Sequence, residues 1–557
     1  MYKVHKLAKS LYIFYSTSMN VLISKKQNSI PQTTFDLQSL LLKNRDLTTQ
    51  KLQHTFFHPT HPKDLTPSDV GIDPQQLQSA ISLIKQAKES QDLVIVYGDY
   101  DADGITATTI LWETLYEIGV NALPFIPERM DGYGLTDASI EKLLAQHQPK
   151  LLITVDNGIV AHEQIKQLKK QGIQVIISDH HQLDGALPEA DAVVHTTHLC
   201  GATTAWMIAR ELHKEKALSM LDLCAIATIA DQVPLRDANR SFAKFGLEAL
   251  RTTRRPSLNM LFELANIKKE KITEHTINFG IAPRINAVGR LDSAMDALRM
   301  MCAKTPGSAK KYAEKIHIKN IERQEKTQTA LDDAIEQAKK QTDKKIIVVA
   351  SENYHEGIIG LVAGRLCELF YKPAIAIAIH DGTAKGSGRS VSGVNIVEMV
   401  RQVRDDLIDV GGHPMACGFS MESEKIEEMT EHVQKIAESI DDALLVPKFE
   451  VECVLPLPLV SVETADMIQT FAPFGQTNPE PVFLFEDVKV EDKQTYGKTY
   501  TITKFLLSQG GGKNIVEAIT FDPRINENSF EKGVIGSVQV NEFRGERKAQ
   551  VKIKSRG

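Results

Sequence analysis

The amino-acid sequence predicts a multidomain α/β protein with a parallel sheet, and three observations support this fold class. The chain has 557 residues, which is too long for one hydrophobic core because single domains usually span about 100–200 residues. Short β-branched segments alternate with helical patterns after residue 73, as expected for successive βαβ units. After residue 445 the pattern changes to alternating apolar and polar residues, which is typical of a small β-barrel.

The composition is that of an ordinary soluble protein. Hydrophobic residues make up 42% of the chain and charged residues 24%, with a net charge of −6, which argues against wholesale disorder. No uncharged apolar segment reaches the roughly 20 residues of a membrane-spanning helix, so we expect no membrane association. The net charge decides little about nucleic acid, because acidic metal ligands and a local basic track can coexist.

The six cysteines are scattered through the chain without close pairs. Zinc ribbons and disulfide frameworks need closely spaced cysteines, so neither is expected. Unpaired thiols are typical of a reducing compartment. We therefore expect a cytoplasmic protein.

The first 73 residues are interpreted as an N-terminal extension and lead-in segment. Leu11–Ile23 is fairly apolar and follows three lysines, a weak similarity to a signal peptide. Polar residues interrupt this segment, so we favour an extension, with Met19 as an alternative start to Met1.

Residues 74–305 are predicted to form the first α/β domain, with acidic residues and histidines where its strands end. The predicted strands are Leu93–Tyr97, Leu151–Val155, Val175–Ile177 and Ala192–Val194. In open α/β sheets, ligands bind beyond the carboxyl ends of the strands. We therefore expect the clusters that follow the first three strands to converge, namely Asp99–Asp103, Asp156 and Asp179–His181.

The rest of the chain is divided by its pattern into three further parts. Residues 306–342 carry one polar helical pattern and are predicted to form a long connecting helix, whereas Gly280–Arg290 before it is predicted to be a loop. Residues 343–445 are predicted to form a second α/β domain with two glycine-rich segments, a turn at Ser387–Arg389 within Gly386–Arg389 and the segment Gly411–His413. Residues 446–557 are predicted to form a small β-barrel or sandwich.

The segment from Val96 to Gly104 carries the first chemical signal. Asp99, Asp101 and Asp103 stand at alternating positions between a buried strand and a helix expected to begin near Ile105. Asp residues at a helix start can simply cap it, but three close carboxylates repel one another unless a cation neutralises them. A divalent metal site is therefore favoured.

A rival interpretation is the aspartyl-phosphate motif of haloacid-dehalogenase phosphatases, which Asp101-x-Asp103-Gly-x-Thr resembles superficially. Those enzymes would need a downstream lysine arrangement. The chain instead supplies Asp156-Asn-Gly and Asp179-His180-His181 at the next strand ends. An isolated histidine pair is usually a surface or core feature, but beside these carboxylates it favours metal binding and acid-base chemistry.

These segments resemble the ordered motifs of the DHH phosphoesterases. Two further segments, Ala227–Leu235 and Ala282–Arg290, are similar to the RecJ branch of that family. Segments in the second half resemble the associated DHHA1 domain, namely His355–Gly360, Gly386–Arg389 and Gly411–His413. The resemblance covers most of the chain from about Asp92 to Ser420, and it is weaker from Pro473 to the end.

The resemblance implies two divalent cations, Mn²⁺ or Mg²⁺, as cofactors. By this resemblance Asp156 bridges the two metals and His181 is a catalytic residue beside them. A mixed carboxylate and imidazole set suits Mn²⁺ somewhat better than Mg²⁺. The implied metal ligands are Asp101, Asp103, Asp156, His180 and Asp231.

The resemblance also implies residues that bind the substrate. Arg129 and the segment Ser387-Gly388-Arg389 would hold a terminal 5′ phosphate, and His413 would act near the scissile phosphate. Tyr133 would stack on a base or fill a loop. Three residues would line the path of the strand, namely Arg284, Asn286 and Arg290. Taken alone, each could equally be a salt-bridge, turn or loop residue.

The implied activity is that of a metal-dependent 5′-3′ exonuclease that degrades single-stranded DNA to 5′-mononucleotides in DNA repair and recombination. A single-strand-binding protein and a helicase are the expected protein partners. One alternative is a DHH phosphodiesterase for short oligonucleotides or cyclic dinucleotides, although the extra C-terminal domain favours a longer polymer. The other is a non-catalytic scaffold, which should have lost metal ligands that this chain retains.

The sequence departs from the family pattern at two places. His195–Cys200 is shorter than the segment expected there, and a surface loop is favoured over the use of His195 and His198 as metal ligands. Tyr97 stands where small-substrate relatives have a histidine, which agrees with the RecJ branch and puts the coordination of one metal in question.

Overall fold

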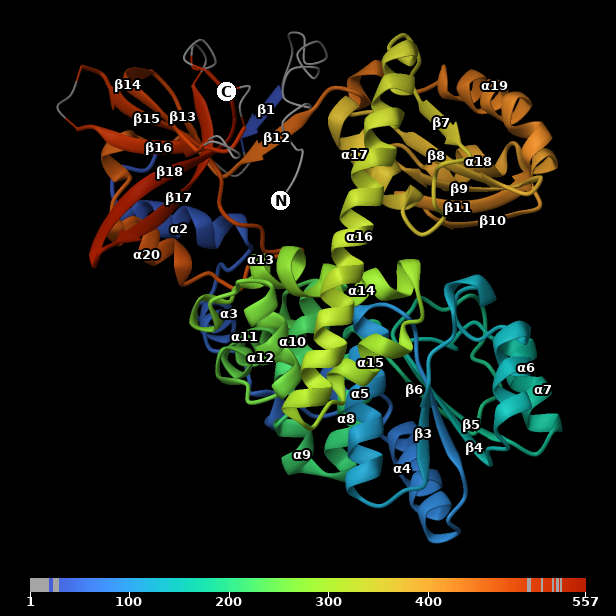
Figure 1. Cartoon of the computed structure of the whole chain (residues 1–557). Helices are drawn as coiled ribbons and strands as arrows, with labels where there is room; N and C mark the ends of the chain where they lie inside the picture. Colours follow the sequence, from blue (N-terminus) through green and yellow to red (C-terminus); the bar gives the residue numbers. More distant parts are fainter. Residues whose placement is uncertain are drawn as a thin grey trace. The chain divides into compact units, whose positions relative to one another are not determined.

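The computed structural model describes residues 20–23, 30–497, 502–511, 514–522, 525–526, 530 and 533–556, and the side chains of these residues from 30 to 554. Both candidate starts, Met1 and Met19, lie outside them. The chain divides into two compact units, of which one contains Leu47–Glu322 and Phe471–Glu480 (Figure 1). We call this the parallel-sheet unit. Among the described residues, no helix is both long and apolar enough to cross a membrane.

The parallel-sheet unit is built around a five-stranded sheet in the order β3-β2-β4-β5-β6, with every pair of neighbours parallel. The predicted parallel sheet is therefore present. The prediction missed β3, an edge strand that contains Pro124; proline is accepted at an edge because one side of that strand has no partner. The strands are β2 Val94–Tyr97, β3 Ala122–Phe125, β4 Leu151–Val155, β5 Gln174–Asp179 and β6 Ala192–His195.

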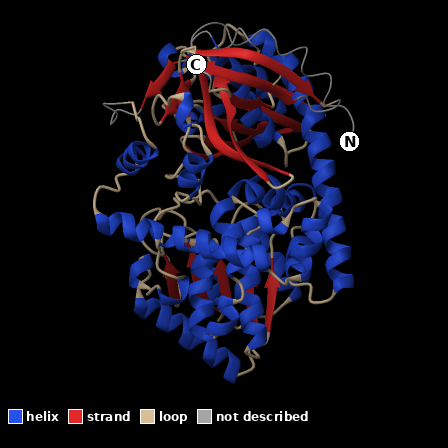
Figure 2. Ribbon diagram, turned by 90° about the vertical axis from the view of Figure 1, so that its left-hand side faces the viewer, coloured by secondary structure: helices blue, strands red, loops and turns tan. Residues whose placement is uncertain are grey.

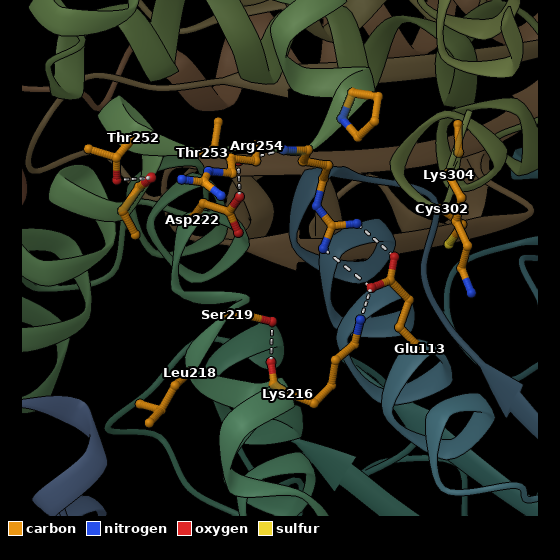
Figure 3. A pocket seen from close by; sticks show the side chains of 14 residues that line it. Glu113, Lys216, Leu218, Ser219, Asp222, Thr252, Thr253, Arg254, Cys302 and Lys304 are labelled. Atoms are coloured by element: carbon orange, nitrogen blue, oxygen red, sulfur yellow. Dashed lines mark hydrogen bonds and ion pairs between the residues drawn. The ribbon is translucent and has the colours of Figure 1, made fainter. Parts of the chain in front are cut away.

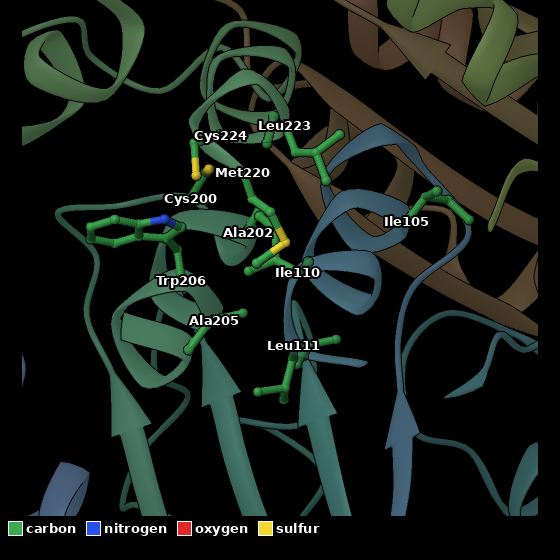
Figure 4. Packing of buried hydrophobic residues seen from close by; sticks show 14 of the residues in the cluster. Ile105, Ile110, Leu111, Cys200, Ala202, Ala205, Trp206, Met220, Leu223 and Cys224 are labelled. Atoms are coloured by element: carbon green, nitrogen blue, oxygen red, sulfur yellow. The ribbon is translucent and has the colours of Figure 1, made fainter. Parts of the chain in front are cut away.

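Successive residues along a strand belong alternately to two separate hydrophobic cores, one on each face of the sheet. Val94 and Val96 belong to the larger core, whereas Ile95 and Tyr97 belong to the smaller one. Figure 2 shows the strands of this sheet among their helices, and Figure 4 shows Ile110, Ala202 and Met220 within the larger core. The helices of the larger core include α4 Pro74–Glu89, α5 Ala102–Glu117 and α8 Gly201–Leu212; those of the smaller core are α6 Asp137–Gln146 and α7 His162–Lys170.

The strand order contains a switch in direction beside β2. The chain passes from β2 to β3 on one side and then returns to place β4 on the other side of β2. The helices that follow β2 and β4 therefore leave the sheet on opposite faces, which opens a crevice at the carboxyl ends of these two strands. Asp99–Asp103 and Asp156 follow these two strand ends.

The helical part of this unit corrects one prediction. Gly280–Arg290 is not a loop: it lies in a π-helical turn, Ile277–Ile281, and in α14 Ala282–Leu291. Ile285 and Val288 are buried on one face, and Pro283 is tolerated because it stands in the first turn of α14. The other helices here are α3 Gln50–Phe57, α9 Lys214–Leu218, α10 Leu221–Ala230, α11 Asp237–Thr252, α12 Pro256–Leu264, α13 Glu274–Thr276 and α15 Met295–Met301.

A segment from much later in the chain, Phe471–Glu480, belongs to the parallel-sheet unit. The buried guanidinium of Arg240 donates hydrogen bonds to the carbonyl oxygens of Phe471 and Ala472 at 3.0 and 2.9 Å. The carbonyl of Gln476 accepts a hydrogen bond of 2.9 Å from the N–H of Leu235. The late segment therefore anchors the stretch that follows α10.

A long helix, α16 Pro306–Ala338, lies where the connecting helix was predicted. The second unit then contains a five-stranded sheet in the order β10-β11-β9-β8-β7, with helices α17 Ile359–Phe370, α18 Ile396–Arg401 and α19 Ile426–Ala437. Only the pair β7 and β8 is parallel. The strands are β7 Ile347–Ser351, β8 Ala374–His380, β9 Thr383–Arg389, β10 Asp409–His413 and β11 Ala416–Glu422.

Both glycine-rich segments of this sheet lie in strands, so the prediction of a turn at Ser387–Arg389 was wrong. A Cβ atom on Gly386 would lie 2.0 Å from the ring of Phe419, and one on Gly388 would lie 2.6 Å from Sγ of Cys417. These glycines leave room for side chains of the neighbouring strand instead of permitting a turn. In β10, Gly412 has a φ of +138° and its missing Cβ makes space for the backbone of Ala416.

The C-terminal part contains the strands that the alternating pattern predicts, in a six-stranded sheet of order β13-β17-β18-β16-β15-β14. Val538 and Val551 are paired across it and buried. The N-terminal lead-in segment contributes helix α2 Thr34–Asn44 and strand β1 Asn20–Ile23, which pairs with β12 Lys448–Val451. The other elements are α20 Val462–Gln469, β13 Phe483–Phe485, β14 Val488–Tyr496, β15 Ile502–Gln509, β16 Val516–Thr520, β17 Val534–Phe543 and β18 Glu546–Arg556.

Candidate metal centre

The turn after β2 places its carboxylates at the start of α5. This helix begins at Ala102 and not near Ile105 as predicted, because Asp101 acts as its N-cap. Oδ1 of Asp101 accepts hydrogen bonds from the N–H groups of Asp103 and Gly104 at 2.9 and 3.0 Å. A Cβ on Gly104 would lie 2.6 Å from Cβ of Asp99, so glycine permits the tight turn.

Asp103 is held by the first residues of α8. Its two carboxylate oxygens accept hydrogen bonds of 2.7 Å from the N–H groups of Gly201 and Ala202. A Cβ on Gly201 would lie 2.2 Å from Oδ1 of Asp156. Gly201 therefore allows the start of α8 to approach two carboxylates at once. The sequence interpretation missed this residue, although a glycine at the start of a predicted helix was a usable signal.

His180 lies at the centre of the carboxylates. Its Nε2 atom is 3.1 Å from Oδ1 of Asp156 and 3.7 Å from carboxylate oxygens of both Asp103 and Asp231. Asp156 follows β4 with a φ of +64°, a strained value for a residue with a side chain. Asp231 is the C-cap of α10. The structure thus brings together residues that are up to 128 positions apart in the sequence, from Asp103 to Asp231.

Potential ligand atoms gather into overlapping groups around Asp156. Within each group the atoms lie within 4.8 Å of one another. Asp99 belongs to one of these groups but was not among the predicted metal ligands. The groups are Asp103 with His180 and Asp231, Asp156 with His180 and His181, and Asp99 with Asp101 and Asp156. Asp156 is shared between two of them, as a bridging ligand would be.

The electrostatics of this cluster indicate that it needs a cation. Burial, together with neighbouring carboxylates, raises the pKa of Asp99 to about 8 and that of Asp231 to about 9, and raises the pKa of Asp156 well above its usual value. Oδ1 of Asp99, Oδ1 of Asp156 and Nε2 of His180 are buried without a hydrogen-bond partner. Oxygen atoms with one imidazole nitrogen form a donor set that fits Mn²⁺ or Mg²⁺.

His181 lies at the edge of this centre and is hydrogen-bonded on both sides of its ring. Its Nδ1 lies 2.7 Å from Oδ1 of Asp179, and its Nε2 lies 2.7 Å from the hydroxyl of Tyr133. Burial alone would lower the pKa of His181, but Asp179 and the other carboxylates raise it to about 9. The buried hydroxyl of Tyr97 donates to the carbonyl of Gly134, so Tyr97 supports the loop that carries Tyr133.

Arg129 and Arg290 come together around Tyr100. The guanidinium of Arg129 lies 4.3 Å from the centre of the Tyr100 ring, and its Nε donates a hydrogen bond of 3.0 Å to the carbonyl of Gly289. The positive charge of Arg290 also favours the ionised form of the Tyr100 phenol. Both arginines were predicted from the sequence to bind the substrate. The fold brings them together at the end of α14.

The other two predicted residues of α14 differ in their surroundings. Arg284 donates hydrogen bonds to Nδ1 of His317 and to the carbonyl of Gly280, so its guanidinium is engaged within the protein. Asn286 lines a hollow of about 480 Å³ beside α10, together with Gln232, Asn278 and the exposed Phe279. Oδ1 of Asn286 is buried there without a hydrogen-bond partner. Asn286 thus borders the hollow, but its amide oxygen is enclosed by the protein.

The predicted phosphate-binding residues of the second unit form their own group. A guanidinium nitrogen of Arg389 donates to Oγ of Ser387 at 3.2 Å and to the carbonyl of Gly388 at 2.8 Å. A Cβ on Gly360, in the first turn of α17, would lie 3.0 Å from the Arg389 guanidinium. The strand register aligns His413 with Ala416, and Ala416 with Arg389. His413 and Arg389 therefore share one face of the sheet, two strands apart.

The shortened segment after β6 does not contribute to the metal centre. A ring nitrogen of His195 hydrogen-bonds to the carbonyl of His181 at 2.7 Å, and the ring of His198 packs near Gly71. Neither residue belongs to a potential metal-binding group among the described residues.

The fold and the acidic centre define the class of this protein. Residues 93–228 match the model of the DHH family, N-terminal domain. Residues 343–439 match the DHHA1 domain, and residues 451–555 match the RecJ OB domain. The C-terminal sheet is accordingly an OB domain.

Known proteins narrow this class further. The chain is 33% identical to the single-stranded-DNA-specific exonuclease RecJ of Bacillus subtilis, over 93% of this chain and 67% of that protein. It is 29% identical to the RecJ of Salmonella typhimurium, over 88% of this chain and 92% of that protein. The crystal structure of Thermus thermophilus RecJ in complex with Mn²⁺ matches with a TM-score of 0.79 and 26% identity, over 96% of this chain and 79% of that one. The chain belongs to the RecJ family.

Proposed function

We propose that this protein is a metal-dependent exonuclease that hydrolyses single-stranded DNA from the 5′ end to 5′-mononucleotides. The observation that carries the proposal is the cluster of buried carboxylates around His180, in which Oδ1 of Asp99 has no hydrogen-bond partner and Oδ1 of Asp156 lies 3.1 Å from Nε2 of His180. RecJ relatives are named single-stranded-DNA-specific exonucleases, and one RecJ structure contains Mn²⁺.

The metal ligands are proposed to be Asp101, Asp103, Asp156, His180 and Asp231, with Asp99 as a further candidate. Divalent cations held here would activate water as the nucleophile and stabilise the leaving oxygen of the phosphodiester. The protein then needs no side-chain nucleophile. Asp103 keeps its orientation through the two N–H groups of α8, at 2.7 Å each.

His181 is proposed to act beside the metals as a proton donor to the leaving group or as a ligand of the phosphate. In the metal-free protein, the hydrogen bond to Asp179 and the nearby carboxylates raise the pKa of His181 to about 9, which favours the protonated imidazole. Asp179 and Tyr133 fix the ring from its two nitrogens. A fixed, positively charged imidazole is suited to an oxygen that gains negative charge.

Selection of the strand end is proposed to rest on phosphate-binding groups. Ser387 and Arg389 lie beside the first turn of α17, and the N-terminal end of a helix favours an anion. Arg129 and Arg290 would provide two further guanidinium groups for a phosphate of the strand. His413 shares the sheet face with Arg389 and is proposed to act on a nearby phosphate.

Asn286 is proposed to contact the strand from the lining of the hollow beside α10, whereas Arg284 would help by supporting α14. The OB domain is proposed to bind single-stranded DNA further along the polymer, because such domains track a strand with basic and aromatic side chains. Phe521 is exposed there, with Nζ of Lys552 5.9 Å from the centre of its ring.

The proposal is tested with purified protein, Mn²⁺, and matched single-stranded, duplex and dinucleotide substrates labelled separately at each end. We expect mononucleotides to be released only from the 5′ end of single strands. Activity confined to dinucleotides would assign the protein to the small-substrate branch of the DHH family instead.

The control for this experiment is Asp156→Ala. It removes a ligand from the metal centre, so hydrolysis should be lost while the folded protein remains. Full activity in this variant would overturn the metal assignment. Arg389→Ala should mainly weaken the preference for a 5′-phosphorylated end, and an unchanged preference would remove Arg389 from the phosphate site.

The cellular setting is proposed from the cysteines and from the needs of the proposed activity. All six cysteines are unpaired, in keeping with a reducing cytoplasm. A single-strand-binding protein and a helicase are proposed partners, because an exonuclease of this kind needs an accessible single strand. The test is whether each partner co-purifies with this protein from cells. Cells that lack the gene for that partner are the control.

A further inference from the structure

A second polar hollow lies in the parallel-sheet unit, away from the metal centre. It has a volume of about 540 Å³ and is lined by residues between Glu113 and Lys304 at the ends of several helices (Figure 3). We call it the distal pocket. Asp103 and Glu113 are ten residues apart on α5, which corresponds to about 15 Å at 1.5 Å per residue. A ligand in the distal pocket would therefore not touch the metal ligands.

The floor of the distal pocket carries more positive than negative charge. The carboxylate of Glu113 binds the guanidinium of Arg255 and the ammonium of Lys216, each at 2.7 Å (Figure 3). Burial opposes ionisation of Glu113, but these two cations hold its pKa below the usual value, so it is charged. Two cations on one carboxylate leave one positive charge in excess.

The second acid of the pocket, Asp222, is occupied by hydrogen bonds. Its carboxylate accepts from the hydroxyl of Thr253 at 2.6 Å and from the N–H of Leu223 at 2.8 Å. Asp222 is buried, and burial raises the pKa of its carboxyl group while the charge of Arg255 lowers it. Both of its oxygen atoms are therefore engaged within the protein.

Two further cations line the distal pocket from exposed positions. Arg254 has no hydrogen bond or ion pair within the part of the chain that the structure describes. Nζ of Lys304 lies 4.3 Å from the centre of the Tyr116 ring and has no carboxylate partner among the described residues. Both side chains can reach a ligand without breaking an ion pair.

We propose that the distal pocket binds a small phosphate-bearing ligand of nucleotide size. Four cationic side chains, Lys216, Arg254, Arg255 and Lys304, outnumber the two acids Glu113 and Asp222 in its lining. Arginine and lysine are the side chains best suited to phosphate oxygens, and the volume lies in the range of roughly 300–1,000 Å³ for small-ligand sites. This binding site is separate from the proposed exonuclease activity and does not depend on it.

The test is calorimetric titration of the full chain with ATP, inorganic pyrophosphate and adenosine. EDTA is present throughout, so that the metal centre does not recruit the phosphates. Arg254→Ala combined with Lys304→Ala should weaken binding of ATP and pyrophosphate by about tenfold or more, while adenosine should not bind in the pocket. Both residues are exposed, so the variant should fold, and a melting curve checks this.

The matched control is Lys85→Ala combined with Lys88→Ala, which removes the same charge from the exposed face of α4. It should bind ATP as the unaltered protein does. Hydrogen exchange locates the ligand: ATP should protect residues 213–222 and 249–256 in the control but not in the Arg254/Lys304 variant.

Binding of pyrophosphate as tight as that of ATP would support the proposal and show that the phosphates alone are recognised. Tighter binding of ATP would support it and add recognition of the nucleoside. Equal ATP affinity in both double variants, or protection that is absent from residues 213–222 and 249–256, would overturn it.

Discussion

The hydroxyl of Tyr133 lies 2.7 Å from Nε2 of His181, whose Nδ1 lies 2.7 Å from Asp179. Both nitrogens of the imidazole are therefore fixed, one by a carboxylate and one by a phenol. The sequence interpretation expected Tyr133 to stack on a base or fill a loop, and its ring is indeed 56% exposed. The hydrogen bond suggests that Tyr133 acts on the chemistry as a positioning residue.

Tyr133→Phe separates these two roles because it keeps the ring and removes only the hydroxyl. If Tyr133 positions His181, loss of a hydrogen bond of about 1 kcal/mol should lower kcat roughly fivefold with little change in KM. The pH profile of kcat should shift as well, since the partner of the imidazole is gone. Tyr116→Phe, which alters an exposed phenol on α5, is the control. Full activity of Tyr133→Phe, with a raised KM only in Tyr133→Ala, would instead support stacking.

Asp99→Asn tests the carboxylate that the sequence interpretation left out of the metal set. Asp99 is buried, groups with Asp101 and Asp156, and has an unpaired oxygen. The amide retains the shape but not the charge, so the Mn²⁺ concentration needed for half-maximal activity should rise about 10–100-fold. Asp92→Asn, seven residues earlier and before β2, is the matched control. If both variants need the same Mn²⁺ concentration, Asp99 is not part of the metal centre.

The sequence predicted the convergence of Asp101, Asp156 and His180 for a simple reason. Each follows the carboxyl end of a strand, and parallel strands present those ends at one edge of the sheet. The position of Asp231 came from family resemblance, because it follows a helix whose packing the strand pattern does not reveal.

Other features were beyond the sequence pattern because they depend on contacts between distant segments. Gly201 matters only because α8 meets Asp103 and Asp156, which is a property of tertiary packing. Glycine and proline in Gly280–Arg290 favoured a loop, yet burial of Ile285 and Val288 stabilises a helix there. Gly386 and Gly388 likewise make room for neighbouring side chains within a strand.

Gly201→Ala should damage the metal centre more than the fold. The added methyl group would lie 2.2 Å from Oδ1 of Asp156, so either α8 or that carboxylate must move. Overpacking of this kind costs about 1–3 kcal/mol, and displacement of Asp156 should also weaken Mn²⁺ binding measured by calorimetry. Gly307→Ala is the control because nothing lies within 4 Å of its added Cβ. Unchanged Mn²⁺ affinity in Gly201→Ala would show that the contact is readily relieved.

The metal-free protein should lose stability as the pH rises. The pKa of Asp99 is about 8 and that of Asp231 about 9 in the folded state, against about 3.9 in an unfolded chain. The folded state therefore binds more protons than the unfolded state between these values. The resulting stabilisation is complete below about pH 4 and is lost progressively up to about pH 9.

Melting curves in EDTA and in Mn²⁺ would measure this effect. In EDTA, the contribution of these carboxylates should make the melting temperature fall between pH 6 and pH 9, whereas Mn²⁺ should stabilise the protein more at pH 8 than at pH 6 because it binds the ionised carboxylates. Asp99→Asn should flatten the slope in EDTA, since the amide carries no titrating proton, and Asp92→Asn should leave it unchanged. A melting temperature in EDTA that rises over this range in both the unaltered protein and Asp99→Asn would show that the buried carboxylates are already ionised and stabilised without a cation.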